Sequence, residues 1–297
     1  MQIGIDLGGT KIEALALAAE AVVAPRRRIP SPRAYEGTLE AVVSLVAELE
    51  AETGRSGSVG IGIPGVVARA TARVKNANSV WLNGRPLQAD LEARLGRPVR
   101  MANDANCFTL SEAIDGAGRG VETVFGVILG TGVGGGIAIG QRILDGPNQI
   151  TGEWGHNPLP WMTLEERGEA PACYCGKTGC VETWLSGPGF ERDAARLSDM
   201  RRSAREVVRA AESGDPGALE ALRRYEDRLA RGLAGVINIL DPGVIVLGGG
   251  MSNLPGLADA VAALLPRHVF SDAVLTRVLL NRHGDSSGVR GAAWLWP

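Results

Sequence analysis

The chain has 297 residues and a formal net charge of −2; 45% of its residues are hydrophobic and 22% are charged. This length allows one large domain or two lobes with separate cores. The charge balance gives no overall basic field for nucleic acid, and no apolar run reaches the roughly 18 residues that span a bilayer. A strand-like segment begins at Ile3, where a signal peptide would otherwise lie, and four cysteines in so long a chain do not indicate a disulfide scaffold. We expect a cytoplasmic enzyme that binds neither nucleic acid nor a membrane.

The first segment, residues 2–18, is predicted to form two short strands joined by a glycine-rich turn. The turn contains Gly8, Gly9, Thr10 and Lys11. Its glycines let backbone N–H groups approach a phosphate, and its threonine and lysine add donors. Asp6 ends the first strand, where it is placed to hold Mg²⁺ through water. An ordinary hairpin with a Gly-Gly turn gives the same pattern, so both alternatives stay open for this motif alone.

Two later segments repeat this design. Residues 124–139 are predicted to form a strand, a turn over 130–136 and a second strand, about 120 residues after the first unit. Such a repeat indicates duplicated halves. A third glycine cluster, residues 248–253, follows the buried-strand run 244–247. Three glycine turns that each follow an apolar strand suit the triphosphate and the adenosine of a nucleotide.

A helix, a strand and a polar loop are predicted between the first two units. The helix covers residues 39–49, and a buried strand over 60–65 ends in a turn at Gly65. Residues 74–87 are too rich in Asn and Gly for a strand or a helix, and they contain Trp81. Loops of this composition commonly recognise a polar small molecule, and a solvated connector is the alternative.

Residues 98–113 contain a strand-to-helix junction that carries polar side chains. The helix is predicted to begin near Asp104, with Asn103 and Asn106 beside it. Asp104 has two interpretations: an N-cap, which is a frequent use of Asp, or a general base that lies beside amides and between two phosphate-type turns. Cys107 is interpreted as a buried core thiol.

A cysteine-rich segment follows the second glycine turn. It holds thiols and an imidazole, the ligand set that Zn²⁺ prefers, at His156, Cys173, Cys175 and Cys180. Glu153 and Glu182 flank this cluster, so the metal would be either catalytic or a clamp for a substrate pocket. Three thiolates and one imidazole fill a tetrahedron and leave no open position, which favours a structural site.

The rest of the chain is predicted to be largely helical. A long helix is expected from Asp215 to about Leu240, opened by an Asp-Pro pair, and a final capped helix over 285–296. The expected core stripe of the long helix is Leu219, Leu222, Tyr225, Leu229, Leu233 and Val236. Four arginines before it are interpreted as a solvated face without function: Arg201, Arg202, Arg205 and Arg209. Strands that alternate with helices through both halves indicate an α/β protein.

Taken in order, these motifs resemble those of the ROK-family sugar kinases, a branch of the actin-like ATPase superfamily. The matching motifs are DLGGTK at 6–11, NDAN at 103–106, GTGVGGG at 130–136, EWGH at 153–156, CYCGKTGC at 173–180 with Glu182, and the glycines at 248–250. Each motif is weak alone, but the ordered set spans almost the whole chain and is specific. Segments 74–87, 153–162 and 283–297 further resemble the fructokinase (manno/fructokinase) branch.

The resemblance implies a ribonuclease H-like α/β fold of two duplicated lobes with a cleft between them. The smaller lobe would comprise residues 1–115 and about 285–297, with the first phosphate turn and the catalytic aspartate. The larger lobe would comprise residues 116–284, with the second phosphate turn, the zinc loop and the adenosine turn. The resemblance also implies a homodimer and three cofactors, namely ATP, Mg²⁺ and structural Zn²⁺.

The resemblance gives each matched residue a role. Asp104 would take the proton from the sugar hydroxyl that attacks the γ-phosphate of ATP. The sugar would be bound by Asn83, Asn103, Asp104, Glu153, His156, Glu182 and Gly65. ATP and Mg²⁺ would be bound by Asp6, Gly8, Gly9, Thr10, Lys11, Thr131, Gly132, Val133, Gly134, Gly249 and Gly250. Zinc would be bound by His156, Cys173, Cys175 and Cys180.

One segment departs from the family pattern. Residues 157–172 form a longer link between His156 and Cys173 than many family members have. Because the link contains two prolines and Trp161, we expect an ordered loop that keeps His156 as the fourth zinc ligand and shapes the choice of sugar.

The expected activity is transfer of the ATP γ-phosphate to the 6-hydroxyl of fructose, with mannose or glucose as further acceptors. The alternatives are an N-acetylglucosamine kinase or a glucokinase of the same family and, less favoured, a sugar-responsive transcriptional regulator. Regulators of the family carry a helix-turn-helix before the first glycine turn, and here that turn begins at Gly8. We therefore expect a kinase.

Overall fold

The computed structural model describes residues 1–198 and 201–297, which group by their contacts into two compact units. The first unit comprises Met1–Gly120, Gln141–Thr151 and Arg282–Pro297, and the second comprises Val121–Gly140 and Gly152–Asn281. This division differs from the boundaries expected from the sequence chiefly in residues 141–151. Three hydrogen bonds attach that segment to the strand β5 region of the first unit: Arg69 donates to Asp145 at 2.6 Å, Gln149 donates to the backbone oxygen of Val67 at 2.8 Å, and the backbone N–H of Arg69 donates to Gln149 at 3.0 Å.

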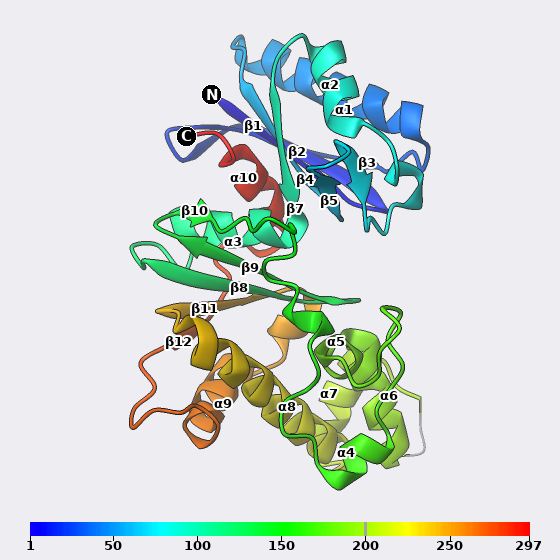
Figure 1. Ribbon diagram of the computed structural model, residues 1–297, viewed down its shortest axis with the longest axis vertical. Coiled ribbons are helices and arrows are strands. Elements are labelled where there is room, and N and C mark those ends of the chain that lie inside the picture. The colour runs from blue at the N-terminus through cyan, green and yellow to red at the C-terminus, as the bar shows by residue number, and fades with distance from the viewer. Residues whose placement is uncertain (199–200) are drawn as a thin grey trace. The chain divides into compact units, whose positions relative to one another are not determined.

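The first unit is built on a five-stranded sheet (Figure 1). In spatial order its strands are β3 (Ala21–Pro30), β2 (Lys11–Ala18), β1 (Gln2–Leu7), β4 (Ser58–Ile63) and β7 (Val99–Asn103). β1 is antiparallel to β2 and parallel to β4, so the first predicted strand–turn–strand unit is confirmed. Helices α1 (Tyr35–Thr53) and α2 (Leu87–Leu95) pack on one face, and α3 (Asp104–Ile114) and α10 (Ser287–Ala293) pack on the other.

Helix α10 approaches the sheet closely because two strand positions are glycines. A Cβ on Gly4 would lie 2.0 Å from the backbone oxygen of Val289, and a Cβ on Gly60 would lie 1.8 Å from that of Ala292. Side chains alternate between the two faces of a strand, so the isoleucines next to these glycines fill the core under α1. The helix is shorter than predicted because a 3₁₀ turn, Gly284–Ser286, precedes it.

The polar segment 74–87 contains more regular structure than predicted. The strand β6 (Arg73–Lys75) pairs with β5 (Val66–Ala68), and a 3₁₀ turn covers Val80–Leu82. Trp81 anchors this turn, because its indole N–H donates to the hydroxyl of Thr38 on α1 at 3.2 Å. Tertiary contacts therefore order a segment whose composition favours a loop.

The second unit repeats the central strand pattern of the first. Its neighbouring strands are β9 (Val133–Ile139), β8 (Thr123–Leu129), β11 (Val244–Gly248) and β12 (Arg277–Leu280). β8 is antiparallel to β9 and parallel to β11, as β1 is to β2 and β4. This repeat confirms the predicted duplication, and the duplicated α/β arrangement is the actin-like ATPase fold. The short strand β10 (Arg142–Ile143) lies in the segment grouped with the first unit.

Helices of the second unit pack around α8 (Pro216–Leu240), visible as the long helix in Figure 1. The others are α4 (Leu164–Gly168), α5 (Val181–Leu185), α6 (Gly187–Ser198), α7 (Ala204–Glu212) and α9 (Leu257–Leu264), with 3₁₀ turns over Trp154–His156, Gly250–Asn253 and Leu265–Arg267. Asp215 caps α8 as predicted, since its side chain accepts from the N–H of Ala218 at 2.8 Å. The predicted core stripe is wrong at Leu219, which is 49% exposed, because Ala218 and Ala221 face the core in that turn instead.

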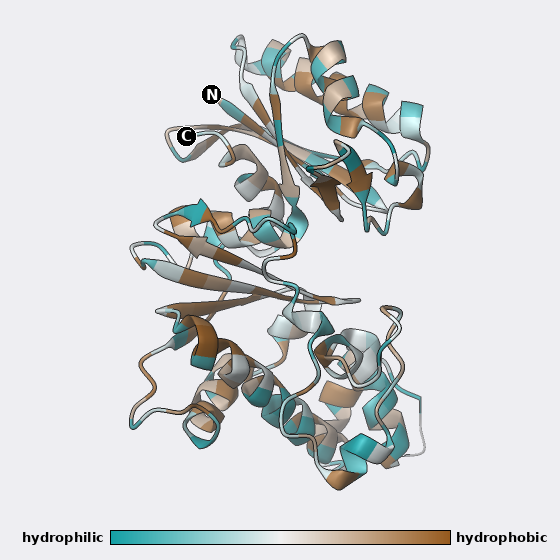
Figure 2. Cartoon of the chain, viewed as in Figure 1, coloured by the Kyte–Doolittle hydropathy of each residue, from teal (hydrophilic) through white to brown (hydrophobic). Residues whose placement is uncertain are grey.

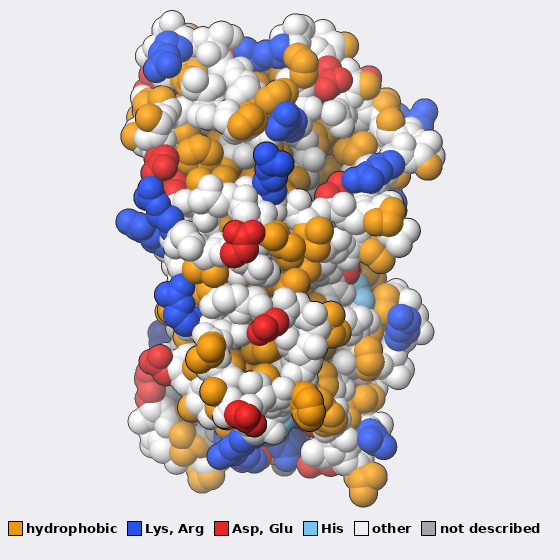
Figure 3. Space-filling view, turned by 60° about the vertical axis from the view of Figure 1, so that its left-hand side comes forward, with side chains coloured by type: hydrophobic (Ala, Val, Ile, Leu, Met, Phe, Trp, Pro, Cys, Tyr) orange, Lys and Arg blue, Asp and Glu red, His pale blue; other side chains and the backbone are white. Residues whose placement is uncertain are grey.

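Hydrophobic residues concentrate along the strands and on the helix faces that cover them (Figure 2). On the molecular face drawn in Figure 3, acidic and basic side chains are interspersed, in keeping with the near-neutral charge balance. Within residues 1–198 and 201–297, no helix combines the length and the apolar character that a membrane crossing requires.

Buried ion pairs fix the segment 157–172 to α8. The segment is ordered, as expected, and contains α4, whose first turn is closed by a capping box between Thr163 and Glu166. The carboxylate of Glu166 accepts hydrogen bonds from Arg228 at 2.8 Å and from Arg231 at 2.7 Å, and all three side chains are buried. Burial by itself raises the pKa of Glu166, but the bonds from Arg231 and Arg228 outweigh it and lower the pKa to about 2.

Replacing Glu166 with glutamine should lower the free energy of unfolding by about 1–3 kcal/mol, because two buried guanidinium groups lose a shared carboxylate, although Arg228 keeps its pair with Asp193 and Arg231 its pair with Asp227. Chemical denaturation at neutral pH measures the loss. The matched control is Glu165→Gln, whose 55% exposed carboxylate pairs with Arg224 and should contribute less than about 1 kcal/mol. In the wild type the stabilisation by Glu166 is complete above roughly pH 4.3 and declines as the pH falls toward 2. Equal destabilisation by the two variants would contradict this account.

Candidate functional site

The first glycine turn carries an excess of positive charge. The N–H of Gly8 donates to the backbone oxygen of Lys11 at 3.0 Å, which closes the turn between β1 and β2. The ammonium of Lys11 lies 2.7 Å from the carboxylate of Glu13, and Arg28 lies 2.5 Å from it. Arg26 also pairs with this carboxylate, which is buried. Among the described residues, these three cations outnumber the carboxylates that they contact, since only Arg28 has a second carboxylate partner, Asp285 at 4.0 Å, and such an excess attracts phosphate.

Asp6 and Asp104 form a second electrostatic feature of the first unit. Burial, and next the charge of Asp104, raise the pKa of Asp6 to about 7. Two carboxylates that oppose each other's ionisation in this way are stabilised by a cation, and carboxylate oxygens are the ligands that Mg²⁺ prefers. The pair therefore fits the predicted magnesium site. Gly288 of α10 lies against it, because a Cβ at that position would be 3.1 Å from Oδ2 of Asp6.

The junction between β7 and α3 separates the two interpretations of Asp104. The N-cap of α3 is Asn103, whose Oδ1 accepts from the N–H of Ala105 at 2.9 Å. Asp104 is the first residue of the helix, and its Oδ1 accepts from the same N–H at 2.8 Å. The N-cap interpretation of Asp104 is thus wrong, because Asn103 occupies that position. The amide of Asn103 also donates to the backbone oxygen of Gly65 at 3.4 Å.

Asn83 and Gly65 hold their loops in shape. The Asn83 side chain accepts from the N–H of Ala77 and donates to its backbone oxygen, both at 2.9 Å. Gly65 has a φ of 150°, and a Cβ there would lie 2.7 Å from the backbone oxygen of Lys75. These contacts assign both residues a bracing role, and direct contact with a sugar stays a prediction for each.

The second glycine turn is shorter than predicted. The strand β9 already begins at Val133, so residues 134–136 belong to the strand and not to the turn. The backbone oxygen of Gly134 accepts from the indole N–H of Trp154 at 3.0 Å. A Cβ on Gly135 would lie 2.8 Å from the same indole. Packing against Trp154 therefore accounts for the glycine at position 135.

Glu182 connects the second turn with the cysteine-rich segment. Its Oε2 accepts from the N–H of Val133 at 3.0 Å, and a Cβ on Gly132 would lie 2.6 Å from that oxygen. Glu182 lies in the first turn of α5, directly after Cys180. The position of the glycine turn thus depends on the segment that carries the cysteines.

The four expected zinc ligands lie together. The Nδ1 atom of His156 and the sulfurs of Cys173, Cys175 and Cys180 are all within 4.8 Å of one another. The contacts between Cys175 and Cys180 and between Cys173 and His156 are both 3.6 Å. A tetrahedral zinc with Zn–S bonds of about 2.3 Å places its sulfurs about 3.8 Å apart. Burial raises the pKa of Cys180 to about 12, and a divalent cation offsets this resistance to ionisation. The residues fit zinc.

His156 presents its second nitrogen to a residue that the sequence-based predictions missed. Its Nε2 lies 2.9 Å from the hydroxyl of Tyr174, and the two rings are perpendicular. Burial, and then the charges of Glu182 and Glu153, raise the pKa of Tyr174 to about 12, which places both predicted sugar-binding carboxylates near this tyrosine. The position of Tyr174 between two cysteines of the cluster was the available signal.

A cavity of about 870 Å³ connects the second and third glycine turns. Its lining includes Gly130 and Thr131 from the second turn and Gly250 from the third. Arg205 and Arg209 of α7 also line it, and both residues are exposed, as expected for a solvated face. Packing of α7 on α8 turns this face toward the glycine turns, a long-range contact that the sequence pattern does not encode.

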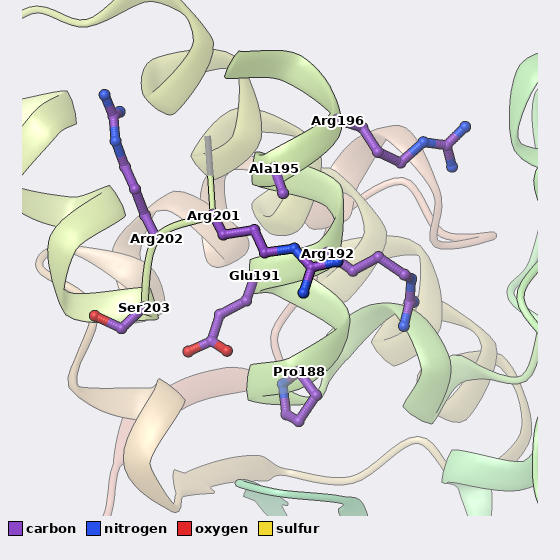
Figure 4. Close-up of a pocket in the computed structure, with 8 residues that line it drawn as sticks. All are labelled: Pro188, Glu191, Arg192, Ala195, Arg196, Arg201, Arg202 and Ser203. Atoms are coloured by element: carbon purple, nitrogen blue, oxygen red, sulfur yellow. The ribbon is translucent and has the colours of Figure 1, made fainter. Parts of the chain in front are cut away.

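A neighbouring cavity of about 800 Å³ extends this groove along α6 (Figure 4). Pro188, Glu191 and Ser203 line both cavities. Figure 4 shows Arg201 extending toward the helix that carries Glu191, whereas Arg202 points away from it. The side chain of Arg202 pairs with Asp215 at 3.2 Å, which assigns it a structural contact.

Comparison with known proteins agrees with these features. The ROK family model matches residues 2–297. N-acetyl-D-glucosamine kinase from Escherichia coli O6:H1 is 43% identical over 299 residues, which cover 99% of each chain. The crystal structure of a ROK hexokinase from Thermus thermophilus has a TM-score of 0.87 at 33% identity, covering 98% of this chain and 96% of that one. A ROK family glucokinase from Streptomyces griseus, solved with glucose and AMPPNP, has a TM-score of 0.79 at 29% identity, covering 99% and 98%.

Two duplicated α/β units with glycine turns define an actin-like ATPase fold, and the second unit carries a cysteine–histidine cluster that fits zinc. The chain belongs to the ROK family.

Proposed function

We propose that this protein is an ATP- and Mg²⁺-dependent hexose kinase that prefers N-acetyl-D-glucosamine and phosphorylates its 6-hydroxyl. The observation that carries the proposal is 43% identity, over 99% of both chains, with a kinase named for that sugar. The site adds chemical support, because a phosphate-type turn and a carboxylate pair suited to Mg²⁺ occur in one unit.

Fructose, the acceptor expected from the sequence, has weaker support. That expectation was based on segments 74–87, 153–162 and 283–297. The similar proteins described above are named as kinases of N-acetylglucosamine, as a hexokinase and as a glucokinase. Glucose is the second candidate, because the glucokinase that is 29% identical was solved with it.

In the proposed reaction Asp104 is the general base. It accepts the proton of the sugar hydroxyl as that oxygen forms a bond to the γ-phosphorus of ATP, and the bond from phosphorus to the β–γ bridging oxygen breaks to release ADP. Asn103 supports this role, because it caps α3 and so fixes the first residue of the helix. Mg²⁺, when bound near Asp6, neutralises charge on the phosphate oxygens.

ATP would be bound by groups from all three glycine turns. Lys11, held by the buried Glu13, supplies a positioned cation beside the first turn. The cavity between the second and third turns has room for a nucleotide and is lined by Arg205 and Arg209, whose charges complement phosphate. We also propose that ATP and Mg²⁺ are bound by the other residues expected from the sequence, namely Gly8, Gly9, Thr10, Thr131, Gly132, Gly249 and Gly250.

Zinc would have a structural role. A site with three cysteines and a histidine has no open position for a substrate. Its function would be to hold His156 and Glu182 in place for the sugar, while Glu153, which is exposed, adds a third polar group. Contacts of Asn83 and Gly65 with the sugar, and the formation of a homodimer, also stay predictions.

An acceptor panel tests the proposal. The purified protein is assayed with ATP and Mg²⁺ against N-acetylglucosamine, glucose, mannose and fructose, and kcat/KM is measured for each. We expect N-acetylglucosamine to give the highest value, at least tenfold above fructose, because a site built to pair a polar substituent discriminates strongly against analogues that lack it. A higher value for fructose would restore the sequence-based expectation.

A further inference from the structure

Tyr174 is an aromatic residue that contacts His156 of the cysteine–histidine cluster. Its side chain is 81% exposed, although it lies between two cysteines of the metal cluster. Its hydroxyl is 2.9 Å from Nε2 of His156, and its ring stands at 90° to the imidazole with centroids 5.1 Å apart.

The two nitrogens of His156 have different partners, and this decides what Tyr174 can do. Nδ1 faces the sulfur of Cys173 at 3.6 Å and belongs to the ligand set of the cluster. With Nδ1 committed in this way, the ring proton is on Nε2, which donates to the tyrosine oxygen. The tyrosine O–H then remains as a donor. Tyr174 therefore places a hydrogen-bond donor next to His156.

The surroundings of the phenol contain the groups proposed to bind the sugar. His156 contacts it directly, Glu153 caps the turn that carries His156, and Glu182 lies in the helix that Cys180 of the cluster caps. The backbone on either side is fixed, because the N–H of Cys173 donates to the backbone oxygen of Lys177 at 2.8 Å and that of Gly176 donates to Cys173 at 3.0 Å. An exposed aromatic side chain with a polar tip, on a fixed backbone and beside carboxylates, is typical of a carbohydrate-binding surface.

We propose that Tyr174 contacts the acceptor sugar and helps to determine which sugar binds. Its hydroxyl donates a hydrogen bond to an oxygen of the sugar, and its ring forms a wall against the C–H face of the pyranose. This inference rests on the proposed hexose kinase function, but it concerns a residue and a contact to which the resemblance gives no role.

Two substitutions separate the hydroxyl from the ring. Tyr174→Phe removes the donor, and Tyr174→Ala removes the wall as well. We expect KM for the sugar to rise about three- to tenfold in the first variant and about ten- to a hundredfold in the second, the range given by one lost hydrogen bond and then by lost apolar contact. KM for ATP and the zinc content should stay at wild-type values, and the discrimination between N-acetylglucosamine and glucose should change.

Lys177→Gln is the matched control, because it lies in the same segment, is exposed and has no role in the proposed site. It should leave every constant unchanged. Direct sugar binding, measured by calorimetry without ATP, gives a second readout. If the wild type binds sugar but transfers no phosphate, the kinase proposal fails and the calorimetric affinities still decide the role of Tyr174.

Three results would overturn the inference. One is a sugar KM and affinity that are unchanged in both variants. Another is a lower KM in Tyr174→Phe, which would mean that the phenol competes with the sugar for His156. The third is no binding of any hexose by the wild type. If Tyr174→Ala loses zinc, the phenylalanine variant decides, since it keeps the ring.

Discussion

Replacing Asp104 with asparagine is expected to lower kcat by roughly 10²–10⁴-fold, the usual contribution of a general base. An asparagine side chain keeps the size of the residue and the acceptor that bonds the N–H of Ala105, so helix α3 should still begin there. It cannot take the proton of the attacking hydroxyl. The effect should therefore fall on kcat, with sugar affinity within a few-fold of the wild type.

Single-turnover kinetics and calorimetry together check this expectation. The matched control is Asp259→Asn, which removes the same charge from an exposed position on α9 and should leave kcat unchanged. Thermal denaturation verifies that both variants are folded. Near-normal kcat in Asp104→Asn would show that another group accepts the proton or that none is needed.

Loss of the zinc site is the second large effect. Cys175 is the exposed thiol of the cluster, so Cys175→Ser removes a ligand without disturbing the core. Structural zinc contributes on the order of 10–16 kcal/mol of apparent binding free energy in small peptides. We expect the variant to bind no stoichiometric zinc, to have a lower Tm and to have a sugar KM at least tenfold higher, since Glu182 and His156 lose their fixed positions.

The same chain of contacts predicts an effect on the nucleotide. Glu182 holds the N–H of Val133 at the second glycine turn, so KM for ATP should also rise, although less than KM for the sugar. Treatment of the wild type with a chelator, followed by return of zinc, should reproduce and then reverse these changes. Cys107→Ala alters a buried thiol outside the cluster and should keep its zinc. An unchanged enzyme after complete zinc removal would contradict the structural role.

Features encoded by local sequence were predicted correctly. The two strand–turn–strand units were recognisable because glycines directly follow apolar alternation, and the structure confirms both pairs of antiparallel strands. The cysteine–histidine cluster was recognisable because residues 173–180 contain three of the four cysteines of the chain. The Asp-Pro start of α8 was equally local.

Features that depend on distant contacts were missed or misassigned. The glycines at 134–136 looked like part of a phosphate turn, but they belong to β9, and the indole of Trp154 leaves no room for a side chain at Gly135. Arg205 and Arg209 are exposed as predicted, but the sequence did not indicate that they also line the cavity beside the glycine turns. The contact between Tyr174 and His156 was not predicted.

The identity of the sugar is the hardest property to predict from motifs. Residues such as Asp104, Glu153 and His156 are proposed to act on hydroxyl groups that hexoses share, so they indicate a sugar and not a particular one. We expect selectivity to depend on the shape contributed by segments such as 157–172 and by side chains such as Tyr174. Such shapes follow from tertiary packing, as the buried pairing of Glu166 with α8 illustrates.

The central claim is direct transfer of the ATP γ-phosphate to a sugar hydroxyl. Phosphorus NMR of a reaction containing the purified protein, ATP, Mg²⁺ and N-acetylglucosamine measures it most directly. The account predicts equimolar appearance of ADP and of a sugar phosphate monoester at carbon 6, with little inorganic phosphate. Formation of inorganic phosphate without a sugar phosphate, for this and every other hexose, would contradict it.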